Sequence, residues 1–573
     1  MPSTCESYDY IICGGGTSGC VIARRLADNL DLTILVIEAG PDSNDLENVH
    51  MTGGWNKNFG KSTDWNIVTP PMPGVNNRRV NLSRGRLLGG SSGVNGTLCI
   101  RGSKQDYDNW DLDGWSGEEV FQYMNRAETF HPKPWYNADA SDHGFSGPLD
   151  IKPHDLAPIS QRMLDSFVSS GLPFHNDLGT VCGVPNGCGH APRTVYKGVR
   201  STAADFLTDH HRRENITIKT DMTVDRVILE QSKEQWRDVV DGATKPLLRA
   251  TGVTVVTASG LTETYLARRE VIVSSGAYCS PPILMRSGLG RREEKEKHGI
   301  ECLKELDGVG RNLMDHVIVF IFYETTQHGL TTDHKLYHKG NMANSLALWK
   351  DQQQGIFSTF PFGSIAFSRL DDRLNEEPIW KEAQQQKQKD ESETHTRHRR
   401  DPFGLTPDQP HIEFFMTECY GGPLQFTDFP HDHQHAFSII ANLLAPKSRG
   451  YVSLASRDPL QVPIVNCKFL DDELDVLVLS EACRFANDIV VRGAGTKDII
   501  RYHSSGTCVM CKDNDPQAVV DNKLRVRGVS GLRVADCSIM PGLIGGHTQM
   551  PAYAIGEKCA DLIKETWTAE VKS

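Results

Sequence analysis

Two histidines near the C-terminus lie in short stretches whose residue types could do chemistry. His503 lies in RYHSSGTCVM, between a helix-like run and a strand-like run, and His547 opens the helix-like HTQMPAYAIGEKCADLIK. From the residues alone, His503 has three interpretations. It is a surface-loop histidine, a metal ligand beside Cys508 and Cys511, or a general base. Imidazole suits the last role because its pKa lies near working pH.

The cysteines argue against the metal interpretation. The chain has 15 of them, an odd number without a regular framework. Cys508 and Cys511 form one CxxC, and Cys182 and Cys188 lie near His190. A structural zinc site usually needs a second pair at matching spacing, and the sequence shows none. We therefore expect no metal site, and reduced thiols rather than disulfides.

The strongest chemical signal is a glycine pattern near the N-terminus. A short apolar run at 8–13 precedes G-x-G-x-x-G, formed by Gly14, Gly16 and Gly19. A helix-like run and a second strand, LTILVIE, follow, and the strand ends at Glu38. Gly14 permits a tight turn, Gly16 lets a pyrophosphate approach the backbone, and Gly19 lets helix and strand pack closely. This order predicts a dinucleotide-binding unit.

The same segment indicates which dinucleotides fit. The helix N-terminus offers free N–H groups and partial positive charge to phosphate. Glu38 accepts from ribose hydroxyls and disfavours a 2′-phosphate, so it argues against NADP but leaves NAD and FAD open. We expect the helix to be apolar at Val21, Ile22, Leu26 and Leu30. The expected contacts are Gly14, Gly16, Thr17, Ser18, Gly19, Glu38 and Ala39.

Bulk composition limits the class of protein. At 573 residues the chain is long enough for two or more domains, and 38% hydrophobic with 23% charged residues is typical of a soluble globular protein. A net charge of −12 gives no electrostatic reason to bind nucleic acid or an anionic membrane. The N-terminus lacks a signal-peptide pattern, AEVKS is not a peroxisomal signal, and no apolar run could span a bilayer. These features predict a cytoplasmic protein.

Longer stretches accompany the glycine pattern. They are GRLLGGSSGVNGTLCIRG at 85–102, GAYCSPPILMRSGLG at 276–290, VGRNLMDH at 309–316, and the segment from Tyr502 to Lys564 that contains both histidines. In this order, from end to end, they resemble the glucose–methanol–choline (GMC) oxidoreductases, which are flavoproteins. Within that family the chain looks most like intracellular fungal members, including formate-oxidase-like proteins.

The resemblance implies an α/β plus α+β fold. A Rossmann-like FAD-binding domain is assembled from non-contiguous segments, and a substrate domain is built on an antiparallel sheet and helices. The implied FAD-binding segments are 1–150, 201–316 and 501–573, the last with the active-site histidines. The substrate domain takes 151–200 and 317–500. Strand-like ITIKTDMTVDRVIL and AFSIIANLLAP, and helical DELDVLVLSEACRFANDIVV, agree with this division.

The resemblance also favours FAD over NAD and implies further contacts with it. Consecutive small residues in GGSSGVNG let the backbone pass close to a large planar ligand. Val224 matches a strand residue whose backbone meets adenine. The helix that begins near His547 aims its N-terminus at the flavin pyrimidine ring, where a helix dipole stabilises negative charge. The implied contacts are Gly89, Gly90, Ser92, Asn95, Gly96, Val224, Asp536, Cys537, His547, Thr548 and Gln549.

His503 and His547 match the active-site pair of the family. The resemblance implies FAD-dependent oxidation of a primary or secondary alcohol, in which His503 takes the hydroxyl proton and the carbinol hydride passes to flavin N5. His547 orients the hydroxyl, and oxygen or a quinone-type acceptor then reoxidises the flavin. Two alternatives stay open: a non-redox, lyase-like enzyme of the same fold, and a catalytically impaired flavin-binding homologue.

Several positions depart from the family pattern. Val94 stands where some members attach flavin through a histidine, so we expect non-covalent FAD. Cys99 replaces a usual aromatic residue, and a buried cysteine there is expected to be inert. The charged, Gln-rich stretch 372–404 is typical of an exposed helical insertion or mobile loop. Before Arg501 the chain lacks a segment that relatives usually have; two interpretations stay open, a reshaped active-site wall or a truncated gene model.

The substrate is left open by the sequence. A small alcohol, an aryl alcohol and an intermediate of fungal secondary metabolism all fit the chemistry. An aromatic run supplies four candidate pocket residues, although such runs more often belong to a core: Phe414, Phe415, Met416 and Tyr420.

Overall fold

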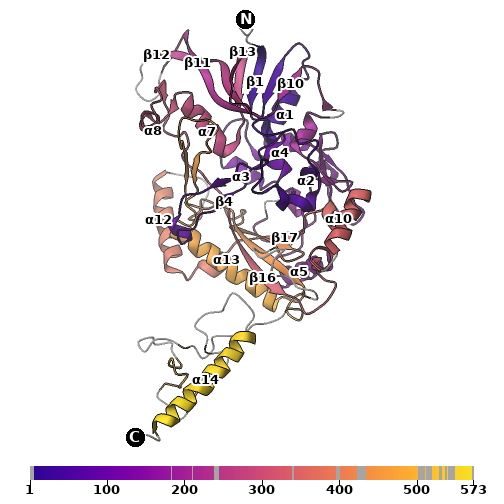
Figure 1. The fold of residues 1–573 in the computed structure, drawn as a ribbon, viewed down its shortest axis with the longest axis vertical. Coiled ribbons are helices and arrows are strands. Elements are labelled where there is room, and N and C mark those ends of the chain that lie inside the picture. The colour runs from indigo at the N-terminus through magenta and orange to yellow at the C-terminus, as the bar shows by residue number, and fades with distance from the viewer. Residues whose placement is uncertain are drawn as a thin grey trace. The chain divides into compact units, whose positions relative to one another are not determined.

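The structure of the chain is a computed structural model (Figure 1). It describes residues 6–181, 184–208, 211–237, 244–338, 341–394, 400–421, 434–500, 510, 519–527, 532–535, 539 and 549–570. The chain divides into two compact units, Met1–Ile499 and Ile500–Ser573. Each unit is described by itself.

The first unit contains a six-stranded sheet built around the N-terminal strand. Its order is β10-β2-β1-β13-β12-β11, parallel from β10 to β13 and antiparallel from β13 to β11. The bounds are β1 Ser7–Cys13, β2 Ile34–Ile37, β10 Ile216–Lys219, β11 Met222–Arg237, β12 Thr244–Thr257 and β13 Thr262–Val273. Parallel strands need both faces covered, which explains the continuous apolar runs of β1 and β2.

Each face of this sheet has its own core. Ile12, Ile34 and Val36 point to the face covered by α1 (Thr17–Leu26) and the short helix η5 (Ala203–Phe206). Ile11 and Leu35 alternate to the other face, where a second apolar cluster forms. The predicted helix ends earlier than expected, because Ala27 caps α1 and Leu30 is 71% exposed beyond it; the placement of Leu30 on the apolar face was wrong.

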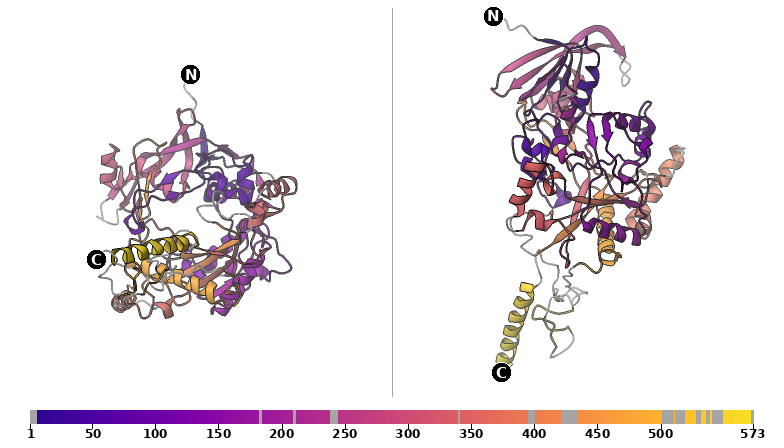
Figure 2. Two further views of the ribbon diagram at one scale, coloured as in Figure 1. Left: turned by 60° about the horizontal axis from the view of Figure 1, so that its bottom comes forward. Right: turned by 90° about the vertical axis from the view of Figure 1, so that its right-hand side faces the viewer.

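β11 and β12 extend past the rest of the sheet. The two strands pair from Met222 with Thr257 out to Arg237 with Thr244, whereas β13 pairs only with residues 252–256 of β12. The outer part of the hairpin therefore lacks a third strand, and Figure 2 shows it projecting from the sheet.

A five-stranded sheet forms the other part of the first unit. Its order is β16-β19-β18-β17-β7, and every neighbouring pair is antiparallel. The bounds are β7 Gly187–Gly189, β16 Val317–Glu324, β17 Phe362–Ser368, β18 Ile412–Thr417 and β19 Ala436–Leu443. Helices α5 (Pro158–Ser169) and α13 (Glu473–Arg492) pack on it, on the side away from the six-stranded sheet in Figure 1.

These two sheets confirm the predicted fold class. A Rossmann-like mixed sheet assembled from distant segments stands beside an antiparallel sheet with helices. β7, from the segment 151–200, pairs with β17 from the segment 317–500. The domain boundaries themselves stay a prediction.

The charged stretch at 372–404 is partly helical. α12 spans Pro378–Thr394, and its Trp380 is fully buried against Phe403 and His411. The predicted helix is therefore present, but its first turn is anchored by a core residue.

The second unit contains α14 (Gln549–Glu570) and a small apolar core. Val520 and Leu524 pack with Ile539 and with Cys559 and Leu562 of α14. Across the described residues of both units, no helix is both long and apolar enough to cross a bilayer.

Candidate cofactor and active site

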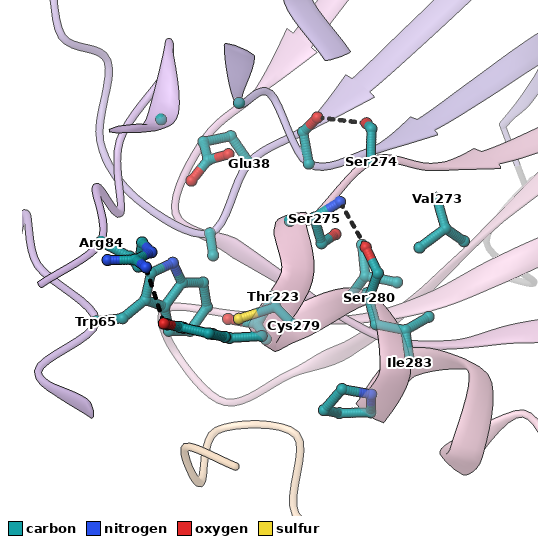
Figure 3. A pocket seen from close by; sticks show the side chains of 18 of the residues that line it. Glu38, Trp65, Arg84, Thr223, Val273, Ser274, Ser275, Cys279, Ser280 and Ile283 are labelled. Atoms are coloured by element: carbon teal, nitrogen blue, oxygen red, sulfur yellow. Dashed lines mark hydrogen bonds between the residues drawn. The ribbon is translucent and has the colours of Figure 1, made fainter. Parts of the chain in front are cut away.

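A cavity of about 570 Å³ opens where β1 and β2 end, at the start of α1 (Figure 3). This is the edge where open α/β sheets bind ligands, because strand ends and helix starts meet there. The cavity brings together eight of the predicted cofactor contacts: Gly14, Gly16, Thr17, Ser18, Glu38, Ala39, Gly90 and Val224.

The three glycines of the first turn are required for different reasons. Gly14 has φ +106°, and a Cβ there would lie 2.8 Å from the carbonyl oxygen of Ser274. A Cβ on Gly19 would lie 2.0 Å from the carbonyl oxygen of Gly14, so helix and turn interlock. A Cβ on Gly16 would meet no protein atom closer than 3.8 Å. The protein itself does not exclude a side chain at Gly16, so the free space fits a ligand that lies against the backbone.

The start of α1 is suited to an anion. Gly16 is its N-cap and makes no side-chain capping bond, and the first turn carries no acidic residue. The first N–H groups of a helix have no intrahelical acceptor and concentrate partial positive charge. A pyrophosphate that lies against Gly16 would accept hydrogen bonds from these N–H groups and would be attracted by the partial positive charge.

Glu38 supplies a buried carboxyl group at the end of β2. One of its oxygens accepts from the Gly40 N–H at 2.9 Å. Burial raises the pKa of Glu38 to about 7, and backbone N–H groups including that of Gly40 oppose the shift only in part. Ribose hydroxyls that donate to Glu38 would favour its ionised form, so its position and chemistry fit the ribose of a dinucleotide.

Other lining residues were not predicted as contacts. The Ser274 hydroxyl donates to the Gly14 carbonyl at 2.9 Å, and the Ser275 hydroxyl donates to the Cys13 carbonyl at 2.7 Å, so both brace the glycine turn. Arg84 donates to the Tyr278 hydroxyl at 2.8 Å, and that hydroxyl lies 3.1 Å from Asp315. Tyr278 belongs to the stretch GAYCSPPILMRSGLG, and Ser274 and Ser275 directly precede that stretch. Arg84 directly precedes GRLLGGSSGVNGTLCIRG, so these two stretches were the signal in the sequence that could have found the missed residues.

The loop GGSSGVNG has two ends with different surroundings. Gly90 lines the cavity, and a Cβ there would lie 2.8 Å from the Gly16 Cα. The Ser92 hydroxyl donates to the Gly89 carbonyl at 2.6 Å and accepts from the Ala203 N–H at 2.9 Å, so it fixes the loop and joins it to the start of η5.

The remaining predicted contacts lie outside the cavity. Asn95 is bonded at 2.7 Å by the buried Arg200, and a Cβ on Gly96 would lie 2.6 Å from the Phe362 ring. Gly19 packs against the glycine turn, and Gly89 has φ +90° beside Ala204.

Val224 lies at the start of β11 and lines the cavity. Its carbonyl accepts from Arg286 at 3.3 Å, and Arg286 also donates to the Asp225 carbonyl at 2.8 Å. Arg286 therefore holds this strand end in place.

The two departures in the same loop region have apolar surroundings. Val94 packs with Val49 and Leu87. Burial raises the pKa of the Cys99 thiol to about 12, which favours the inert thiol form.

Several predicted residues lie outside the described part of the chain: His503, Asp536, Cys537, His547 and Thr548. Gln549 begins α14, where only its backbone is described. The roles of these residues stay predictions. Within the described residues, no cluster of three or more His, Cys, Asp or Glu side chains could hold a metal ion.

Comparison with known proteins identifies the family. The N-terminal GMC oxidoreductase family model matches residues 8–318, and the C-terminal model matches residues 446–556. The chain belongs to the GMC oxidoreductase family.

Individual relatives cover nearly all of the chain. An oxygen-dependent choline dehydrogenase of Burkholderia thailandensis is 31% identical over 98% of this chain and 94% of its own. A glucose methanol choline oxidoreductase of Aspergillus terreus is 29% identical over 97% and 92%. Among solved structures, a formate oxidase of Aspergillus oryzae, studied for its FAD modification, matches with a TM-score of 0.76 and 28% identity over 98% of both chains. The family and this solved flavoprotein support the predicted cofactor, FAD.

Proposed function

We propose that this protein is an FAD-dependent oxidoreductase that oxidises the CH–OH group of a primary or secondary alcohol. The observation that carries the proposal is the cavity at the ends of β1 and β2, where a ligand-sized space over Gly16 meets the buried Glu38. Family membership and the choline dehydrogenase and formate oxidase relatives support redox chemistry on small substrates.

Some of these residues bind the cofactor, and others bind the alcohol and accept its proton. The turn at Gly14–Gly19 and the α1 N-terminus hold the pyrophosphate, and Glu38 holds the adenosine ribose. His503 accepts the hydroxyl proton of the alcohol as general base, and His547 orients that hydroxyl. Bound FAD supplies the two-electron oxidation by accepting hydride. Oxygen or a quinone-type acceptor takes the electrons onward.

We propose that FAD is held without a covalent bond. The supporting residue is Val94, whose side chain has no nucleophile and packs against Val49 and Leu87. Acid precipitation of the purified protein should leave its yellow colour in the supernatant. Flavin that stays in the pellet would overturn this assignment.

The decisive experiment is anaerobic mixing of the FAD-loaded protein with a panel of alcohols. Bleaching of the flavin, with one carbonyl product per bleached flavin, supports alcohol oxidation. Carbonyl release without bleaching would instead indicate a lyase, and neither signal with any alcohol would indicate an impaired flavin-binding protein. Peroxide release on admission of air separates oxygen from other acceptors.

We further propose an intracellular, cytoplasmic member of the fungal type. The similarity to Aspergillus proteins supports this placement, although the Burkholderia relative is equally similar. Fractionation of the source cells with an antibody to the protein tests the compartment.

A further inference from the structure

A loop between two short helices carries large apolar side chains on the surface. The helices are α3 (Lys104–Asp108) and α4 (Gly117–Ala127), which pack against each other and are labelled in Figure 1. We call the connecting residues 109–116 the tryptophan loop. Three of its side chains are more than half exposed: Trp110 (51%), Leu112 (62%) and Trp115 (54%). Together they present on the order of 300 Å² of apolar surface, the size at which a patch on a monomer is often functional.

A column of aromatic contacts holds the two indole rings in place. Phe121 of α4 is buried and meets Tyr107 edge to face, with ring centroids 6.1 Å apart. The Tyr107 ring lies 5.2 Å from that of Trp110, which lies 5.9 Å from that of Trp115. The Tyr107 hydroxyl donates to the Arg101 carbonyl at 2.6 Å. Because these rings are already ordered, a partner that covers them would cost little side-chain entropy.

The backbone of the tryptophan loop is fixed at both ends. The Gly117 N–H donates to the Asp108 carboxylate at 2.8 Å, and the Asn109 amide donates to the Gln409 side chain at 2.9 Å. The loop is therefore a rigid platform.

Two aspartates stand between the tryptophans without a counter-charge. Asp111 and Asp113 are both exposed. Lys104 of α3 lies close in sequence, but it pairs with Glu118 and lies over the Phe121 ring. Among the residues that the structure describes, neither aspartate takes part in an ion pair, and no Lys or Arg lies over either indole ring.

One arginine from a distant segment reaches the loop. Arg400 donates to the Asn109 side-chain oxygen at 2.9 Å and to the Gly404 carbonyl at 2.9 Å. These acceptors are an amide and a carbonyl group, so the bonds hold the segment against the loop without neutralising the aspartates.

Another exposed tryptophan shows what the loop lacks. Trp135 is 45% exposed, and the Lys133 ammonium lies 5.9 Å from its ring centroid. The same ammonium pairs with Asp155 at 2.7 Å, and Asp155 accepts from the Trp135 indole N–H at 3.2 Å. A cation, an aromatic ring and a carboxylate satisfy one another there. The tryptophan loop has the rings and the carboxylates, but among the described residues it has no such cation.

We propose that the tryptophan loop docks a basic segment of another protein, whose Lys or Arg side chains lie on the indole rings and pair with Asp111 and Asp113. Cation–π attraction and ion pairing then act on the same cationic group. The aspartates would repel an acidic partner, and a net charge of −12 opposes docking of a second copy of this chain. The inference stands apart from alcohol oxidation, because the cofactor cavity does not include this loop.

Labelled peptides test the docking directly. Fluorescence anisotropy compares the arginine peptide acetyl-(Gly-Arg)4-amide with its glutamine and glutamate counterparts, each titrated with the full-length, FAD-loaded protein. We expect the arginine peptide to bind at least about 10-fold more tightly than the glutamine peptide, and less tightly as salt is added. Equal binding of these two peptides, or no binding of the arginine peptide, would overturn the assignment to a basic partner.

Variants of the loop locate the binding site. Trp110→Ala and Trp115→Ala should each weaken the arginine peptide roughly 3- to 10-fold, whereas Trp135→Ala, the matched control, should not. Asp111→Asn combined with Asp113→Asn should weaken it similarly and reduce the salt dependence. Asn accepts the positive φ of Asp111, +52°, so this variant should keep the melting temperature of the wild type. If all the variants bind like the wild type, the acidic surface as a whole attracts the peptide and the inference fails.

The basic run of this chain is the competing occupant. The run RHRR ends at Arg400, which is bonded to Asn109. Arg397→Gln combined with Arg399→Gln should leave the affinity for the arginine peptide unchanged. A rise of about 10-fold or more in this variant would show that the run itself competes for the tryptophan loop, and it would overturn the assignment to another protein.

Discussion

The two sheets of the first unit are built from different patterns in the chain. The six-stranded sheet offers a turn of glycines, a helix N-terminus and one carboxyl group, all within the first forty residues. The five-stranded sheet offers side chains on strands that are far apart in the chain, from Phe320 to Phe415.

The proposed function assigns a different ligand to each sheet, the cofactor to the six-stranded sheet and the substrate to the five-stranded sheet. A pyrophosphate is the same in every dinucleotide, so backbone N–H groups and missing side chains are sufficient for it. A substrate is recognised by shape and polarity, which only side chains supply. Substitutions in the first region should therefore change cofactor retention, and those in the second should change substrate preference.

The largest expected effect is on flavin reduction, and it tests whether proton abstraction depends on a residue that belongs to neither sheet. His503→Ala should lower the rate of flavin reduction by roughly 10²- to 10⁴-fold, because it removes a general base. Flavin content, measured by absorbance, should match that of the wild type. Near-wild-type reduction would assign the proton transfer to another residue, and loss of flavin would give His503 a binding role instead.

The next effect separates two glycines three residues apart. Gly16→Ala should leave the cofactor-free fold intact but weaken FAD roughly 10- to 100-fold, because its Cβ has room in the protein and none beneath a phosphate. Gly19→Ala should cost more than about 2 kcal/mol of folding free energy, because its Cβ would overlap the Gly14 carbonyl. FAD titration measures the affinity of the Gly16→Ala variant, and thermal unfolding measures the stability of the Gly19→Ala variant. Unchanged FAD affinity in Gly16→Ala would show that the cofactor phosphates do not bind against this turn.

A smaller effect concerns the pH dependence of the cofactor region. Burial raises the pKa of Glu38 to about 7 without cofactor, above its ordinary 4.5. The native protein then holds more protons than the unfolded chain between these values, so this group lowers stability as pH rises through that window. FAD favours the ionised carboxylate, so its affinity should rise from pH 5.5 to about 7 and then level off.

Glu38→Gln is the matched variant for that profile. Its amide does not titrate, so its FAD affinity should be several-fold weaker at pH 8 and flat with pH. Fluorescence titration of FAD over the pH range gives both curves. The same slope in wild type and variant would assign the titration to a different group.

The smallest effect belongs to the five-stranded sheet. Thr417→Val removes hydroxyl bonds to Ser438 and to the Cys419 carbonyl, each 2.7 Å long, and should cost about 1–3 kcal/mol. FAD affinity should not change. Weakened FAD binding in this variant would mean that the two sheets are not independent in the way described above.

The cofactor region was the more predictable of the two. Gly14, Gly16, Gly19 and Glu38 are close in sequence, and each has a local geometric reason that a pattern can state. Asn95 and Gly96 belong to the same kind of small-residue pattern, yet they lie outside the cavity. Their partners, Arg200 and Phe362, come from distant segments.

The aromatic residues show the same limit on the substrate side. Phe414 and Phe415 are adjacent and identical in type, so sequence alone could not assign Phe414 to the face under α5 and α13 and Phe415 to the core on the opposite face. Only the register of β18 with β17 and β19 separates them. Leu30 was misplaced for a related reason, because α1 ends at Leu26 and the apolar pattern did not mark that end.

The central pairing of the six-stranded sheet has a consequence for how the protein is made. β1 lies between β2 and β13, and Ser7 pairs with Leu266. At ribosomal speeds the N-terminal strand emerges roughly 10–50 s before its partner. β2 can pair with β1 early, but the other edge, with Ile11 and Ile12, stays open until β13 is synthesised. Nascent chains of intermediate length should therefore depend on chaperones, and a pause in translation before β13 should favour aggregation.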